Sequence, residues 1–244
     1  MCSSDLLIAS YGQESLTRGT FARIPIIVGT TTDEGFEVSG VDTDEEAVEQ
    51  LTHSQRWNLN TTQAERLLEL YPNDPTVGAP YGWGNRTWPA RGKQWKRYVS
   101  MATDLTMFAP RRLLAEKMSE EVEQVYSYRW DAPKVNNTPS DIGVRHFSEI
   151  PFVFGNREQK ITPLGEGLGD LRLSVLVMRM WVSFAWGSDP NGHGSEFFLS
   201  FLFLLSSFTG SFGSGDVYTD GCYSSWNCEM AAIWAERYEF CVSI

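Results

Sequence analysis

Two short segments of the sequence carry side chains that could perform acid–base chemistry. Residues 29–35 run Gly-Thr-Thr-Thr-Asp-Glu-Gly and contain Glu34, and residues 143–155 contain His146 three positions after their first glycine. A carboxylate that contacts one ring nitrogen of a histidine fixes the imidazole tautomer and stabilises its protonated form. The other ring nitrogen can then act as a general base. Glu34 and His146 are therefore the candidate catalytic residues.

Each of these segments follows a stretch that is typical of a β-strand. Residues 23–30 form a short apolar run with β-branched side chains that a glycine closes, as in a buried parallel strand. Residues 123–130 alternate and are rich in aromatic side chains, which also favours a strand. If the two strands are parallel neighbours, the loops that follow them emerge at one sheet edge. The sequence thus predicts that Glu34 contacts His146 across 112 positions of chain.

Helical stretches separate and follow these strands. Apolar residues recur at helical spacing over residues 42–54, 61–71 and 96–118, and Pro110 is expected to divide the last of these into two short helices. Residues 74–95 hold several prolines and glycines and are expected to be irregular. Residues 168–186 are apolar almost all round, which predicts a helix packed on the sheet. This alternation indicates the α/β class.

Both segments resemble motifs of the type-B carboxylesterases, a family of cholinesterase-like α/β-hydrolases that includes fungal lipases. The family places its triad acid in G-x-x-x-D-E-G and its histidine in G-x-x-H, followed by a run like the Glu-Ile-Pro-Phe-Val-Phe-Gly of residues 149–155. The resemblance covers about residues 6 to 194. It implies that Glu34 is the triad acid, that His146 is the general base, and that Glu149 is a carboxylate close to this pair. The implied fold is the C-terminal part of an α/β-hydrolase, with an incomplete, mostly parallel sheet and flanking helices.

The sequence departs from the family in its nucleophile. A Gly-x-Ser-x-Gly elbow is absent from all 244 residues, and no glycine run offers an oxyanion hole. The family places both upstream of the glutamate turn, where only 33 residues precede Glu34 here. We therefore expect residues 1–194 to be the C-terminal portion of a carboxylesterase domain that supplies the Glu and His of a Ser-Glu-His triad and is inactive alone. Residues 195–244, which differ in character, are expected to be a divergent tail that is mistranslated or disordered.

Composition excludes several other functions. The chain has 31 acidic against 20 basic residues and no basic run, so nucleic acid is not an expected partner. The apolar run at residues 197–205 is too short to span a bilayer, and the N-terminus lacks the features of a secretory signal. The resemblance implies that the substrate is a small-molecule or lipid ester. Triad chemistry needs no cofactor.

Two alternatives stay open. The first is a non-catalytic, cholinesterase-like module for binding or adhesion, although retention of both Glu34 and His146 argues against it. The second is a metal enzyme that uses a set of acids and histidines, but these residues lack a metal-ligand spacing, and so do the four cysteines. The set in question comprises Asp33, Glu34, His53, His146 and His193.

Overall fold

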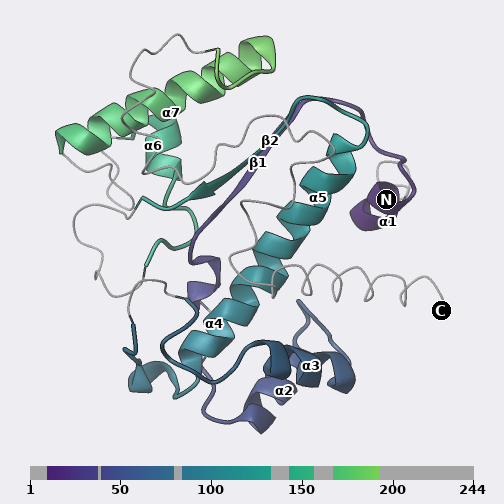
Figure 1. Cartoon of the computed structure of the whole chain (residues 1–244), viewed down its shortest axis with the longest axis vertical. Coiled ribbons are helices and arrows are strands. Elements are labelled where there is room, and N and C mark those ends of the chain that lie inside the picture. The colour runs from purple at the N-terminus through teal and green to yellow at the C-terminus, as the bar shows by residue number, and fades with distance from the viewer. Residues whose placement is uncertain (1–9, 38–39, 80–83, 133–142, 157–166, 193–244) are drawn as a thin grey trace, which may run out of the picture.

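The computed structural model describes residues 10–37, 40–79, 84–132, 143–156 and 167–192 (Figure 1). The tail expected at residues 195–244 lies outside the described residues. In chain order the described helices and strands are α1 (Gly12–Thr17), β1 (Ile26–Thr31), α2 (Asp44–His53), α3 (Thr61–Leu70), α4 (Trp95–Thr103), α5 (Ala109–Ser119), β2 (Val125–Trp130), α6 (Ile150–Phe154) and α7 (Leu168–Gly187). Short 3₁₀ turns occur at Glu34–Glu37 and Pro89–Arg91.

Strands β1 and β2 form a parallel pair, as the sequence predicts, with Ile26 opposite Val125 and Thr31 opposite Trp130. The sheet is covered on both faces (Figure 1). Because side chains alternate along a strand, Val125 packs with Ala115 and Met118 of α5, whereas Trp130 packs toward α6 and α7. The sheet thus lies between α5 on one face and α6 and α7 on the other. The loops that carry Glu34 and His146 both lie at the carboxyl end of the strand pair.

The two short helices that the sequence predicts over residues 96–118 are α4 and α5. Pro110 lies in the first turn of α5 rather than between the two helices. The irregularity precedes it as a π-helical segment, Asp104–Phe108, between α4 and α5. Proline cannot donate to the preceding turn and crowds the carbonyl four residues back. A wider π turn directly before Pro110 accommodates both effects without ending the helix, and such turns occur often at functional sites.

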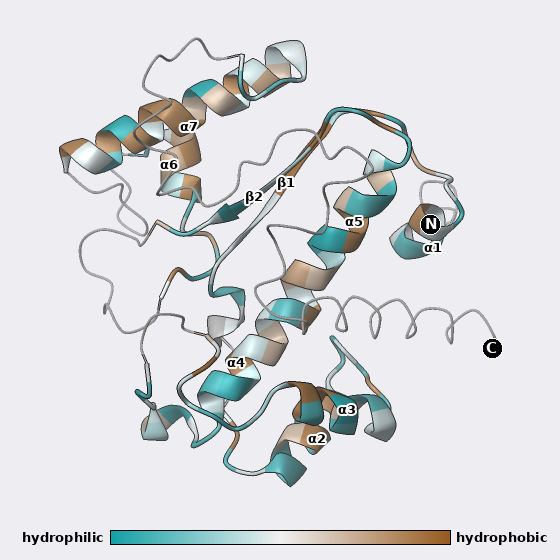
Figure 2. Ribbon diagram, viewed as in Figure 1, coloured by the Kyte–Doolittle hydropathy of each residue, from teal (hydrophilic) through white to brown (hydrophobic). Residues whose placement is uncertain are grey.

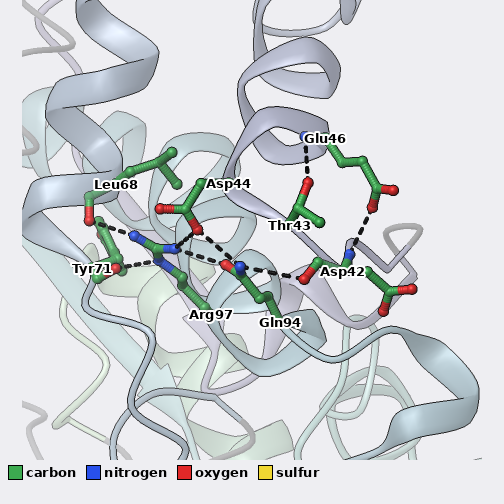
Figure 3. Close-up of polar contacts among 8 residues, drawn as sticks. All are labelled: Asp42, Thr43, Asp44, Glu46, Leu68, Tyr71, Gln94 and Arg97. Atoms are coloured by element: carbon green, nitrogen blue, oxygen red, sulfur yellow. Dashed lines mark hydrogen bonds and ion pairs between the residues drawn. The ribbon is translucent and has the colours of Figure 1, made fainter.

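Helices α2 and α3 pack on α4 through a cluster of apolar side chains that includes Leu51, Leu67 and Met101. Buried Arg97 of α4 joins the three helices (Figure 3). Its guanidinium donates to the carbonyl oxygens of Leu68 and Tyr71 near the end of α3 and to Asp44 at the start of α2. The same guanidinium contacts the Gln94 side chain, so one cation satisfies polar groups of three chain segments.

Helix α7 packs against the sheet through edge-to-face ring contacts of Trp181 with Tyr128 and of Phe184 with Tyr126. Figure 2 shows apolar residues on much of the helix. Only one stripe is buried, however, and Trp186 on another side is 94% exposed. Across the described ranges, no helix combines the length and apolarity that a membrane crossing requires.

Candidate active site

Glu34 lies at the start of the 3₁₀ turn that follows β1, and its side chain is only 4% exposed. The amide of Thr31 donates to Glu34 Oε1 at 2.6 Å, which closes a tight turn on the carboxylate. The next residue, Gly35, packs against α4, where an added Cβ would lie 2.4 Å from the carbonyl oxygen of Val99. Only a residue without a side chain fits here, so glycine at position 35 allows the turn to pack closely against α4.

His146 lies in the short loop between Gly143 and α6. Its Nδ1 hydrogen-bonds to Glu34 Oε2, which is the contact that the sequence predicts. The imidazole is 34% exposed, and Phe147, at a positive φ of 67°, packs its ring on it with centroids 3.9 Å apart. Within the described part of the chain, no hydrogen bond to Nε2 is present. Glu34 therefore occupies one ring nitrogen and leaves the other available for a proton transfer.

Asp33 joins the two loops. Its amide donates to the carbonyl oxygen of Val144 at 2.8 Å, and its Oδ2 accepts from the amide of Val144 at 2.7 Å. A parallel bridge between Asp33 and Arg145 pairs the segment after β1 with the histidine loop. Asp33 is 2% exposed, so both bonds are shielded from water.

Glu149 lies one residue before α6, close to the Glu34–His146 pair. Burial raises the pKa of Glu149, and the neighbouring Glu34 carboxylate raises it further, while His146 acts in the opposite direction. Burial, with Glu149 and Glu34, also raises the pKa of the Tyr128 hydroxyl. Two carboxyl groups thus lie near the histidine, and Glu34 is the one that contacts it.

His146 and Glu34 lie on the wall of a cavity of about 410 Å³. This volume falls in the range of small-molecule sites. Most of the remaining wall comes from α2 and the loop after it, and from α4 and the π-helical segment. The lining residues are Gly35, Gln50, Ser54, Arg56, Trp57, Tyr98, Ala102, Thr106 and Met107. Trp57 Nε1 donates to Thr106 Oγ1 at 3.2 Å, which ties the loop after α2 to the π-helical segment.

Of the other candidate metal ligands, the structure describes His53 and Asp33. His53 ends α2, where its Nδ1 lies 3.0 Å from the carbonyl oxygen of Glu49, and His193 is not among the described residues. The Asp33 carboxylate accepts from the amide of Val144. In the described ranges, no group of three or more histidine, cysteine or acidic side chains could hold a metal ion.

The sequence named Asp33 only as a candidate metal ligand, and it assigned no role to the cavity residues other than Glu34 and His146. Asp33 lies beside Glu34 inside the same motif, and this adjacency was the available signal. Trp57 and Tyr98 stand in ordinary amphipathic stretches, where an aromatic residue indicates only a core position. Their place on the cavity wall depends on how α2 and α3 pack on α4.

Comparison with known protein families shows to which family this chain belongs. A model of the carboxylesterase family matches residues 3–204. The chain belongs to the carboxylesterase family. Carboxylesterases similar to it include para-nitrobenzyl esterase of Bacillus subtilis (strain 168), which is 26% identical over 182 residues covering 73% of this chain and 32% of the relative. Lipase 1 of Geotrichum candidum is 27% identical over 193 residues, covering 76% of this chain and 30% of that lipase.

Solved structures show the same fold. Aspergillus niger EstA covers 91% of this chain and 41% of its own length, with a TM-score of 0.64 at 19% identity. A PNB esterase structure covers 75% of this chain and 34% of its own, with a TM-score of 0.53 at 26% identity. The fold of this chain is thus of the α/β-hydrolase class, and the chain spans about a third of the length of the curated relatives named above.

Proposed function

We propose that this chain supplies the acid and the base of a Ser-Glu-His triad that hydrolyses carboxylic esters. Glu34 is the triad acid and His146 is the general base. The observation that carries the proposal is the hydrogen bond between Glu34 and His146 Nδ1, with the imidazole on the wall of the cavity. Residues 1–194 form the C-terminal part of the catalytic domain, and residues 195–244 form a divergent tail. The serine comes from outside these 244 residues.

In this mechanism His146 Nε2 takes the proton of the serine hydroxyl as the hydroxyl oxygen attacks the ester carbonyl carbon. Glu34 stabilises the imidazolium that forms and keeps Nδ1 protonated throughout. His146 then donates the proton to the departing alcohol, and water repeats the sequence on the acyl-enzyme. The burial of Glu34 strengthens its interaction with the imidazolium, because the local dielectric constant is lower than that of water.

The substrates are carboxylic esters of small-molecule or lipid size. The names of the relatives support this class, since para-nitrobenzyl esterase and Lipase 1 are both among them. The cavity supports a compact ester, because its volume matches that of small-molecule sites and Trp57, Tyr98 and Met107 add apolar side chains to an otherwise largely polar wall.

The test has two parts. The 244-residue chain alone should hydrolyse 4-nitrophenyl acetate no faster than a His146→Ala variant, because the chain lacks a serine elbow. The gene should encode an in-frame Gly-x-Ser-x-Gly upstream of Met1, and the longer polypeptide should hydrolyse the ester. In that polypeptide, His146→Ala should lower kcat by at least about 10³-fold.

A matched control is His53→Ala, which removes an exposed histidine at the end of α2 and should leave the rate unchanged. Turnover by the 244-residue chain that His146→Ala abolishes would contradict an external nucleophile. A longer polypeptide whose turnover survives His146→Ala would contradict the triad. A gene without the upstream elbow would favour the non-catalytic binding module instead.

A further inference from the structure

The base and the acid of the proposed triad come from segments that only tertiary structure brings together. Glu34 is held from its own side, by the Thr31 amide on its carboxylate and by Gly35 against α4. His146 lies 16 positions along the sequence from the end of β2 at Trp130. The contact between Glu34 and His146 therefore requires an interaction that holds the histidine loop at the carboxyl end of β1.

Within the described residues, Asp33 connects the turn after β1 to the histidine loop. It holds Val144 by two bonds, one from its backbone and one from its carboxylate. Asp33 directly precedes Glu34, and Val144 lies two residues before His146. The two bonds between Asp33 and Val144, called the clamp below, are therefore close in sequence to both members of the pair. The backbone bond could form with any residue at position 33, whereas the carboxylate bond needs an acceptor of this length.

We infer that Asp33 is a positioning residue, whose buried carboxylate fixes the histidine loop through Val144 and so holds His146 Nδ1 at Glu34. This inference rests on the proposed function, since it assigns a role toward the same pair. A carboxylate is the stronger acceptor for a buried N–H, because charge-assisted hydrogen bonds are shorter and stronger than neutral ones. An asparagine at this position retains an oxygen acceptor, whereas an alanine does not.

The experiment follows the imidazole of His146 by ¹H–¹⁵N correlation NMR on the 244-residue chain with labelled histidine. The chain has three histidines, so His53→Ala and His193→Ala variants assign the signals. The wild-type chain should show His146 with a protonated Nδ1 that exchanges slowly. Asp33→Ala should abolish this signature, Asp33→Asn should restore most of it, and His53 should not change in either variant.

The matched control is Asp131→Ala. Asp131 also lies at this strand end and accepts from the Thr32 hydroxyl at 2.6 Å, but it makes no described bond to the histidine loop. Its removal should leave the His146 signals unchanged, so a general loosening of the strand end is separated from the specific clamp. An Asp131→Ala variant that abolishes the signature as fully as Asp33→Ala overturns the inference.

The outcomes separate this inference from the proposed function. If the wild-type chain lacks the Nδ1 signature and Glu34→Gln changes nothing, the triad pairing itself fails. If the signature is present but survives Asp33→Ala, the positioning role of Asp33 fails and the triad proposal stands. If Asp33→Ala does not fold, hydrogen exchange of the wild-type Val144 amide decides, because an amide that exchanges as fast as an exposed one overturns the clamp.

Discussion

The amide of Gly35 donates to the hydroxyl of Thr103 at 2.8 Å, and this bond seats the turn that carries Glu34 on α4. Thr103 is fully buried at the last position of α4, directly before the π-helical segment. The acid, the helix and the π turn that lines the cavity therefore share one junction. A change at this junction should alter the position of Glu34 even though it touches no reacting group.

Gly35→Ala should destabilise the chain by about 1–3 kcal/mol, because the added methyl group meets backbone atoms that cannot move aside. An ideal Cβ lies 2.4 Å from the carbonyl oxygen of Val99 and 2.8 Å from the amide nitrogen of Thr103. Gly12→Ala is the matched control, since nothing lies within 4 Å of a Cβ there, and it should change stability by less than about 1 kcal/mol. Urea unfolding of both variants checks the difference, and equal midpoints would contradict it.

Asp104 should make stability fall as pH rises. Burial raises its pKa from 3.8 to about 6, although the Tyr71 hydroxyl and Arg111 oppose the shift. The folded chain then binds this proton more tightly than the unfolded chain, so the stabilising contribution is complete below about pH 4 and is lost as pH rises through about 6. The loss amounts to about 3 kcal/mol. Other carboxylates, such as Asp44, have lowered pKa values and act in the opposite direction.

The measurement is therefore a difference between two chains. Asp104→Asn has no titrating group at this position but can still accept from Tyr71, so the stability of the wild type relative to this variant should decline between pH 4 and 7. Urea unfolding at several pH values gives this difference. A pH-independent difference would show that Asp104 titrates near its ordinary value.

The strands and the site pair could be predicted from sequence because their signals are local. An apolar run before a Gly-rich acidic turn, and an alternating run before a histidine loop, indicate two strands whose loops share an edge. The start of β1 at Ile26 rather than residue 23 has a local cause as well. Arg23 and Ile24 are exposed, and Pro25 has no N–H to donate to a neighbouring strand.

The clamp at Asp33 and the cavity could not be predicted in the same way. The bond from Val144 to Asp33 depends on how two segments align across 111 positions, and the sequence of neither segment encodes that alignment by itself. The π turn is another case, because Pro110 signals an interruption but not whether the helix ends or widens. Packing of α2 and α3 on α4 decides which residues line the cavity.

Arg97→Met should lower the free energy of unfolding by about 3 kcal/mol or more. The guanidinium forms hydrogen bonds with several polar groups, and the substitution leaves these groups without that partner. The carbonyl oxygens of Leu68 and Tyr71 lose their donor, and the Gln94 side chain loses its contact (Figure 3). Arg66→Met is the matched control on neighbouring α3, where the pair with Glu69 is exposed and should contribute less than about 1 kcal/mol. Thermal unfolding distinguishes the two, and similar shifts in Tm would contradict the bridging role of Arg97.

Asn60→Ala should destabilise the chain by about 1 kcal/mol through the start of α3. Asn60 accepts from the amide of Gln63 at 2.9 Å, and the Gln63 side chain accepts from the amide of Asn60 at 3.1 Å, so both bonds of a capping box are present. Asn60→Asp keeps the acceptor and adds a negative charge at a helix N-terminus, where the helix dipole favours it. This variant should therefore match or exceed the wild type in urea unfolding. Both substitutions remove the same Asn-Thr-Thr triplet as a glycosylation acceptor, so a loss of stability common to both would point to that modification rather than to the cap.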